Sequence, residues 1–281
     1  MKLPFEVDLQ DKVIVITGAG GVLCSEFAIA LAKCNAKIAL LDINKESLNY
    51  VEDEIKSNGG VAKGYVCNVL KPEEIKEVHE QIKVDLGTCD ILINGAGGNH
   101  PKATTDDEYF EFSHLGKIKT FFDLDEEGIR FVFDLNYFGT LLVIKEFALD
   151  MINKKGASII NISSMNAFTP LTKIVAYSAS KASISNLTQW LAVYFSKVGI
   201  RCNAIAPGFF ATNQNRKLLF NEDGTLTPRS EKIINSTPMG RFGEKEELIG
   251  TLLYLVSEEA SGFVNGVVIP VDGGYSAYSG V

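Results

Sequence analysis

The chain has 281 residues, of which 46% are hydrophobic and 22% are charged, a composition typical of globular proteins. Its formal net charge of -8 argues against nucleic acid or an anionic membrane as a partner, because an acidic surface attracts neither. Residues 1–11 lack the apolar core of a signal peptide, and no apolar run approaches the roughly 20 residues that span a bilayer. The five scattered cysteines form no CxxC pair and indicate free thiols in a reducing compartment, so we expect a cytoplasmic protein.

Short β-branched runs alternate with longer helical patterns along the chain. The expected strands cover residues 13–16, 37–41, 62–66, 90–93, 158–162, 200–206 and 267–271. The expected helices cover residues 25–35, 45–58, 72–86, 131–151 and 176–197. This alternation predicts an α/β fold, namely a single-domain, Rossmann-type, doubly wound parallel sheet with helices on both faces.

Two long segments, residues 98–127 and 209–241, interrupt the alternation. Each follows the carboxyl end of an expected strand, the side on which open α/β sheets bind ligands. Loops of this length in a compact domain are usually functional or disordered. We therefore expect residues 1–281 to form one dinucleotide-binding and catalytic domain, in which the two insertions shape the substrate site.

A glycine-rich turn, residues 17–21, connects the first expected strand to the first helix. Glycine permits positive φ and lets backbone N–H groups approach a pyrophosphate at a helix start, although a purely structural turn is the alternative. The candidate cofactor contacts in and beside this turn are Gly18, Gly20, Gly21, Val22 and Leu23.

Asp42 ends the second expected strand, where a carboxylate can accept hydrogen bonds from both adenosine ribose hydroxyls. The same charge would repel a 2′-phosphate, so NAD is favoured over NADP. The alternative is that Asp42 caps the helix beginning near Lys45. Further candidate cofactor contacts follow the third and fourth strands, namely Asn68, Val69, Asn94, Ala96 and Gly97.

Tyr177 and Lys181 are four residues apart in one expected helix and so share a face. A phenol normally has a pKa of about 10, and a nearby ammonium together with a positive nicotinamide ring lowers it, so we expect Tyr177 to act as the acid/base. Ser164, just after a strand, is expected to donate a hydrogen bond to the substrate oxygen. We expect Asn136, a polar residue inside an apolar helical run, to mark a water site linking Lys181 to solvent. Taken separately, each residue also has an ordinary structural explanation as a packed pair, a cap or a satisfied amide.

Together these residues resemble the short-chain dehydrogenase/reductase family over nearly the whole chain. The family's Asn, Ser and Tyr-xxx-Lys tetrad is complete as Asn136, Ser164, Tyr177 and Lys181, with the family's step of thirteen residues from Ser to Tyr. The resemblance implies NAD(H)-dependent chemistry on CH-OH groups and a homotetramer.

The other family motifs are present with departures. The cofactor turn TGxxxGxG begins as Thr17-Gly18, but Val22 and Cys24 replace its later glycines. NNAG appears as Asn94-Gly95-Ala96-Gly97, without its second Asn, and the family's Asp-Val appears as Asn68-Val69. The resemblance further implies that the cofactor is bound by Tyr177, Lys181, Pro207, Gly208 and Thr212.

Within the family the chain looks like the D-mannonate oxidoreductases (fructuronate reductases). The segments that carry this resemblance are the Gly-Val-Leu-Cys turn and residues 98–105, 164–168 and 276–281. This implies interconversion of D-mannonate and D-fructuronate. A sugar acid requires recognition of a carboxylate and hydroxyls, and Arg216 is favoured over Lys102 because a guanidinium binds a carboxylate with two parallel N–H bonds. The candidate substrate contacts are Ser164, Asn166, Tyr177, His100, Lys102 and Arg216.

Two other functions stay open. One is a dehydrogenase for another sugar acid or a polyol, such as gluconate, and apolar walls from Phe110, Phe112, Phe121 and Phe122 would permit a less polar carbonyl compound. The other is a non-catalytic NAD-binding regulator, against which the complete tetrad argues. An acyl-carrier-linked reductase is disfavoured, because a basic docking patch is missing. The expected partner is a small molecule, and no metal site is predicted.

Overall fold

A parallel β-sheet forms the centre of the molecule. Within residues 6–211 and 219–280, which the computed structural model describes, seven strands pair in the order β3-β2-β1-β4-β5-β6-β7. They are β1 (Val13–Thr17), β2 (Lys37–Asp42), β3 (Val61–Val66), β4 (Ile91–Asn94), β5 (Ser158–Ile162), β6 (Arg201–Pro207) and β7 (Val268–Val271). The parallel pairing, with a reversal of strand order at β1 and β4, confirms the doubly wound fold expected from the sequence.

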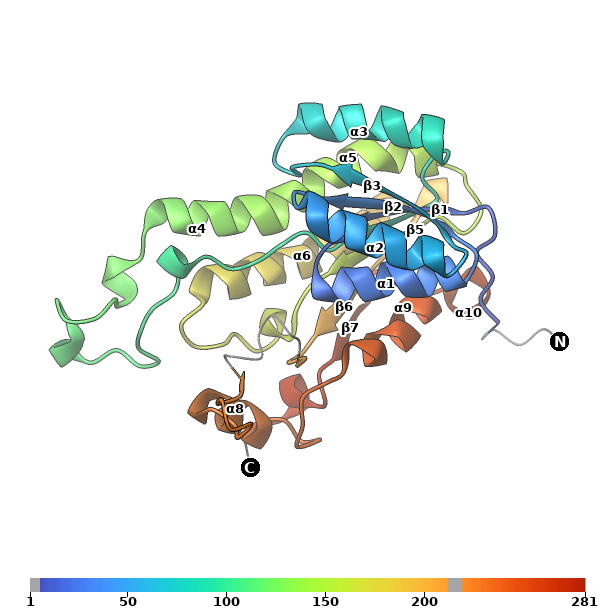
Figure 1. Ribbon diagram of the computed structural model, residues 1–281. Coiled ribbons are helices and arrows are strands. Elements are labelled where there is room, and N and C mark those ends of the chain that lie inside the picture. Colours follow the sequence, from blue (N-terminus) through green and yellow to red (C-terminus); the bar gives the residue numbers. More distant parts are fainter. Residues whose placement is uncertain (1–5, 212–218, 281) are drawn as a thin grey trace.

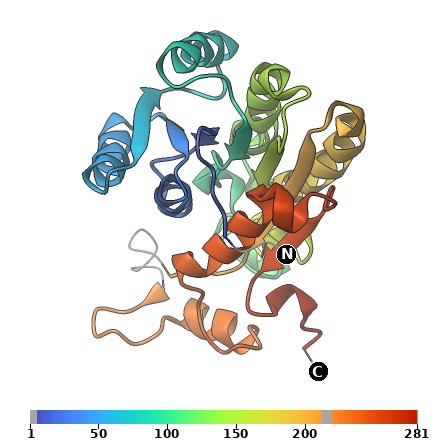
Figure 2. The same ribbon diagram turned by 90° about the vertical axis from the view of Figure 1, so that its right-hand side faces the viewer.

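Helices cover both faces of the sheet (Figures 1 and 2). On one face lie α1 (Val22–Lys33), α2 (Lys45–Ser57) and α9 (Ile249–Val256), and on the other α3 (Pro72–Asp85), α5 (Gly139–Met151) and α6 (Val175–Tyr194). In β1, Ile14 and Ile16 pack toward the first set, whereas Val13 and Val15 pack toward the second. Successive strand side chains point to opposite faces, so a strand covered on both sides appears in sequence as an unbroken apolar run.

The helix expected over residues 131–151 starts earlier and is interrupted. α4 (Glu126–Phe133) continues through a π-helical turn, Asp134–Phe138, into α5. Inside this turn the buried Asn136 donates hydrogen bonds to the carbonyl oxygens of Val132 (2.8 Å) and Gly98 (2.7 Å). A single wide turn of this kind is common at functional sites, and here it directs an amide from a helix toward the loop after β4.

Both insertions contain ordered structure. Residues 98–127 form short 3₁₀ turns at Pro101–Ala103, Phe112–His114 and Phe121–Asp123 before α4 begins. The second insertion contains α8 (Pro228–Asn235), which was not predicted, and α9 and the short α10 (Glu258–Ser261) follow it, also unpredicted. Figure 1 shows α4 and α8 extending beyond the layers of the sheet and its helices.

All five cysteines are free thiols. Among the described helices, none is both long and apolar enough to cross a membrane. In the same described part of the chain, no group of three or more His, Cys, Asp and Glu side chains is placed to hold a metal ion.

Candidate active site

A cavity of about 260 Å³ lies where β1, β4, β5 and β6 end. The segments that follow these strands, together with α6, supply its walls. It is lined by Gly18, Gly21, Val22, Leu23, Cys24, Gly95, Gly97, Gly98, Ile162, Ser163, Ser164, Tyr177, Lys181, Pro207 and Gly208. The cavity therefore brings residues predicted for cofactor binding together with three members of the predicted tetrad.

The glycine-rich turn after β1 lies directly against the loop after β4. Gly18 has a φ of +66°, and a Cβ atom there would lie 2.8 Å from the backbone nitrogen of Ala96. The hydroxyl of Thr17 accepts hydrogen bonds from the N–H groups of Gly95 (3.1 Å) and Ala96 (3.2 Å). Only a residue without a side chain allows the two backbones to approach this closely.

The start of α1 suits a pyrophosphate. Gly21 precedes the helix and has no side chain to cap it, so the N–H groups of the first turn depend on another partner. Gly21, Val22 and Leu23 line the cavity, and a helix N-terminus favours an anion. These residues therefore fit the phosphates of a dinucleotide.

Asp42 links the glycine-rich turn to the end of β2. Its Oδ2 accepts a hydrogen bond from the N–H of Gly20 (3.0 Å), and its Oδ1 accepts one from the N–H of Asn44 (2.9 Å). Asn44, whose Oδ1 accepts from the N–H of Ser47, is the residue that caps α2, so the interpretation of Asp42 as the helix cap is wrong. A carboxylate has about four acceptor positions, so two remain for ribose hydroxyls.

Ser164, Tyr177 and Lys181 come together from the end of β5 and the first turns of α6. The ammonium of Lys181 is 5.7 Å from the centre of the Tyr177 ring and donates a hydrogen bond to the carbonyl of Ile162 (2.9 Å). The Ser164 hydroxyl accepts a hydrogen bond from the N–H of Asn166 (3.2 Å) and lies close enough to Tyr177 to influence the pKa of its phenol.

Asn136 contacts this group indirectly, through its hydrogen bonds to the loop after β4. Its Oδ1 accepts a hydrogen bond from the N–H of Gly98 (3.1 Å), and its Nδ2 donates to the carbonyl of the same residue. Asn136 thus holds both backbone groups of a residue that lines the cavity. The four predicted tetrad residues belong to one continuous structure, although Asn136 itself is not part of the cavity wall.

Burial determines the acidity of the two titratable groups. It lowers the pKa of Lys181 to about 8. It raises the pKa of Tyr177 above the usual value for a phenol, and the neighbouring Ser164 hydroxyl offsets this only in part. The lowering expected for Tyr177 is therefore not produced by the protein groups around it, because loss of hydration outweighs them. A protonated phenol suits the donation of a proton to a substrate oxygen.

The remaining cofactor candidates take mostly structural positions. The side-chain oxygen of Asn68, a candidate cofactor contact, accepts a hydrogen bond from the N–H of Leu70 (3.0 Å), and Val69 is buried in the core. Asn94 donates to the side chain of Asn161 (2.9 Å). Its own Oδ1 is buried and has no hydrogen-bond partner among the residues that the structure describes.

Of the predicted substrate contacts, Ser164 and Tyr177 line this cavity, whereas His100, Lys102 and Asn166 do not. His100 accepts a hydrogen bond from the N–H of Lys102 (3.2 Å), and the ammonium of Lys102 lies 3.7 Å from Asp125. Asn166 is buried and lines a second cavity of about 510 Å³ between residues 166–173 and α6. Thr212 and Arg216 lie outside the described residues.

Five residues of the cavity wall were not predicted to contact ligand: Cys24, Gly95, Gly98, Ile162 and Ser163. For Cys24 and Gly95 a signal was present in the sequence, since both stand where the chain departs from the family motifs. Read separately, the two departures do not show that these residues meet.

Comparison with known proteins shows the relationship. The model of the short chain dehydrogenase family matches residues 12–223. An uncharacterized oxidoreductase of Haemophilus influenzae is 64% identical over 281 residues, covering 100% of this chain and 99% of the relative. The uncharacterized oxidoreductase UxuB of Bacillus subtilis is 49% identical over 279 residues, covering 99% of this chain and 100% of the relative.

A solved structure from Haemophilus influenzae superimposes on the chain with a TM-score of 0.96, at 64% identity and with both chains covered completely. That protein is provisionally named a D-mannonate oxidoreductase, and its structure contains bound NAD. The bound NAD agrees with the cofactor predicted from Asp42. The fold, the cavity and these matches lead to one conclusion: the chain belongs to the short-chain dehydrogenase family.

Proposed function

We propose that this NAD-dependent oxidoreductase interconverts the alcohol and ketone forms of a sugar acid, and that the pair is D-mannonate and D-fructuronate. The observation that carries the proposal is the single cavity in which Ser164, Tyr177 and Lys181 face the open start of α1. The substrate is suggested by the provisional name of the Haemophilus influenzae protein, which is 64% identical to this chain over its whole length.

The nucleotide would be held by the glycine-rich turn, the carboxylate of Asp42 and the loops after β4 and β6. When bound, NADH supplies the hydride. The proposed contacts are Gly18, Gly20, Gly21, Val22, Leu23, Asp42, Asn68, Val69, Asn94, Ala96, Gly97, Tyr177, Lys181, Pro207, Gly208 and Thr212.

Tyr177 gives its phenolic proton to the substrate oxygen in ketone reduction and removes the hydroxyl proton in alcohol oxidation. Ser164 donates a hydrogen bond to the same oxygen as negative charge develops there. Lys181 places a positive charge 5.7 Å from the phenol ring, which stabilises phenolate after the proton has left. Asn136 keeps the loop at Gly98 in position.

Recognition of the sugar acid is assigned to the two insertions and the segment after β5. Asn166 lies next to Ser164, because its backbone N–H donates a hydrogen bond to the serine hydroxyl. His100, Lys102 and Arg216 are the proposed partners of the carboxylate and hydroxyls. Lys102 would have to leave Asp125 to take part, which favours Arg216.

The decisive measurement follows NADH consumption with a panel of hexuronates, sugar acids and polyols. Fructuronate should be reduced with the highest kcat/KM, and Tyr177→Phe should abolish turnover while NADH binding stays nearly intact. Tyr194→Phe, an exposed tyrosine on the same helix, is the matched control and should remain active.

Other outcomes would replace parts of the proposal. If gluconate or a polyol were the best substrate, the proposed substrate would be replaced and the proposed hydride and proton transfer would be kept. A silent panel with firm NADH binding would favour a regulator. Turnover retained by Tyr177→Phe would remove the central assignment of the acid/base.

We also propose a cytoplasmic homotetramer. Exposed apolar side chains on neighbouring helices, Leu149 on α5 and Trp190 and Val193 on α6, support burial between subunits. The free thiols support a reducing compartment. Sedimentation analysis should give four times the mass of 30.6 kDa.

A further inference from the structure

Cys24 and Gly95 meet at the wall of the cavity. An ideal Cβ atom built on Gly95 would lie 2.1 Å from the Sγ atom of Cys24, whereas real Cβ atoms essentially never approach another atom within 3.0 Å. A side chain at position 95 would therefore require the thiol of Cys24 to move, and its Cβ atom would also lie 3.0 Å from the carbonyl oxygen of Thr17. The two residues are 71 positions apart in sequence; Cys24 is at the start of α1 and Gly95 is in the loop after β4.

Cys24 is in the first turn of α1, the turn whose N–H groups open toward the cavity. Its side chain is 4% exposed, and burial raises its pKa to about 12, so the thiol is neutral at physiological pH. A buried neutral thiol behaves as a small apolar group that fills space. Cys24 therefore acts here by its volume and not by nucleophilic or redox chemistry.

Gly95 begins the loop that carries the other half of the site. On one side its N–H donates to the hydroxyl of Thr17 (3.1 Å), and on the other the thiol of Cys24 blocks its approach to α1. Two and three residues further on, Gly97 and Gly98 contact Asn136 and border the cavity with Lys181. The position of Gly95 consequently sets the position of this whole loop relative to α1.

We propose that Cys24 and Gly95 are a matched pair of positioning residues that sets the distance between the start of α1 and the loop after β4. This inference rests on the proposed NAD site, because those two segments would contact the dinucleotide. The pair also accounts for two of the departures from the family motifs at once. The side chain missing at position 95, where the motif has Asn, is compensated by the one gained at position 24, where the motif has Gly.

Lys181 lies close to the same pair. Its positive charge acts to lower the pKa of the Cys24 thiol, although burial raises that pKa by more. A displacement of Cys24 would therefore affect the residues near the nicotinamide as well as those near the phosphates. We expect the main effect in cofactor affinity, since Tyr177 is positioned separately by α6.

The test is a double-mutant cycle made of Gly95→Ala, Cys24→Gly and the variant that combines them. NADH affinity is measured by fluorescence titration, and melting temperature is measured without NADH. Gly95→Ala should raise the Kd for NADH by about tenfold or more, because one added methyl overpacks the contact. The combined variant should recover to within about threefold of the wild-type Kd, since its two changes are not additive.

Two further variants guard against a Gly95→Ala protein that does not fold. Cys24→Ala removes only the sulfur, and should raise the Kd for NADH about threefold while kcat at saturating NADH stays within about twofold. Cys34→Ala, at the other end of α1, is the matched control and should leave the Kd unchanged.

Several results would refute the proposed role of the pair. One is an unchanged Kd for NADH in Gly95→Ala or in Cys24→Ala. Another is a combined variant whose Kd for NADH is no lower than that of Gly95→Ala. Recovery of the melting temperature without recovery of NADH affinity would reduce the contact to ordinary packing and would also overturn it. Wild-type protein that does not bind NADH would instead overturn the proposed function, and the pair with it.

Discussion

Gly97 and Asn136 are in such close contact that a Cβ atom on Gly97 would lie 2.5 Å from the Oδ1 of Asn136. The same atom would lie 3.2 Å from the Nζ of Lys181. An absent side chain in the loop after β4 thus leaves room for two of the four proposed catalytic residues.

Gly97→Ala should therefore impair the site without unfolding the protein. Asn136 or Lys181 must move to admit the methyl group, and overpacking of this kind costs about 1–3 kcal/mol, so kcat/KM should fall about tenfold to a hundredfold. Gly250→Ala on α9 is the control, since a Cβ atom there meets nothing within 4 Å and the residue does not line the cavity. Equal kcat/KM values for the two variants would contradict this account.

Lys181→Met should abolish turnover and yet stabilise the fold. One pKa unit corresponds to about 1.4 kcal/mol, so a fall from 10.5 to about 8 costs the folded state about 3 kcal/mol. The variant also loses the hydrogen bond to Ile162, which offsets part of the stabilisation. We therefore expect a net gain of about 1–2 kcal/mol in the free energy of unfolding near neutral pH.

The gain should depend on pH in a defined direction. Below pH about 8 the lysine is charged in both the folded and the unfolded state, so the penalty is complete. It disappears as the pH rises from about 8 toward 10.5, because the folded state then loses its proton first. Urea unfolding of both proteins at neutral and at alkaline pH checks this, and a gain that grows with pH would contradict it.

Asp42→Asn should weaken the choice between the two nicotinamide cofactors. The amide oxygen can still accept one backbone hydrogen bond, whereas the charge that opposes a 2′-phosphate is lost. The ratio of kcat/KM for NADH to that for NADPH should fall about tenfold. A wild-type protein that prefers NADPH in steady-state kinetics would refute the role of Asp42.

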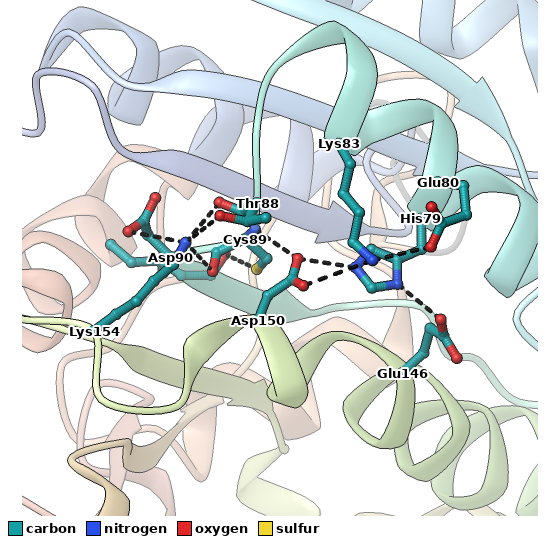
Figure 3. Close-up of polar contacts among 10 residues, drawn as sticks. His79, Glu80, Lys83, Thr88, Cys89, Asp90, Glu146, Asp150 and Lys154 are labelled. Atoms are coloured by element: carbon teal, nitrogen blue, oxygen red, sulfur yellow. Dashed lines mark hydrogen bonds and ion pairs between the residues drawn. The ribbon is translucent and has the colours of Figure 1, made fainter.

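His79→Leu should destabilise the protein while leaving its activity nearly unchanged. The buried ring on α3 bridges two carboxylates of α5, with Nδ1 2.7 Å from Glu146 and Nε2 2.9 Å from Asp150 (Figure 3). Asp150 also accepts from the N–H of Cys89, just before β4, so the cluster lies at the strand end opposite the cavity.

Removing one partner from a buried polar cluster costs about 2–4 kcal/mol, which should lower the melting temperature by several degrees. Glu80→Gln on the same helix is the control, because this carboxylate is exposed and pairs with Lys83 at the surface. A loss of kcat/KM in His79→Leu that exceeds its loss of stability would show that the cluster reaches the site.

Local patterns in the sequence predicted most of the sheet and the helices next to it. The strands are buried on both faces, and for this reason their β-branched runs were visible without knowledge of the fold. The segment Ile249–Val256 is also apolar throughout but forms α9, and periodicity alone does not separate a short buried helix from a strand. The polar α8 is only eight residues long, and its Ile233 packs in a small cluster with Leu219 and Phe242.

The order of residues by itself determined that Tyr177 and Lys181 share a helix face, that Ser164 follows a buried strand, and that glycines stand at the start of α1. These features depend on spacing within a few residues. Only the tertiary structure decided the π-helical turn at Asn136, the contact between Cys24 and Gly95, and the direction in which burial moves the pKa of Tyr177. Each of these depends on the volume, hydrogen bonds or lost hydration contributed by segments distant in the chain, which local spacing does not specify.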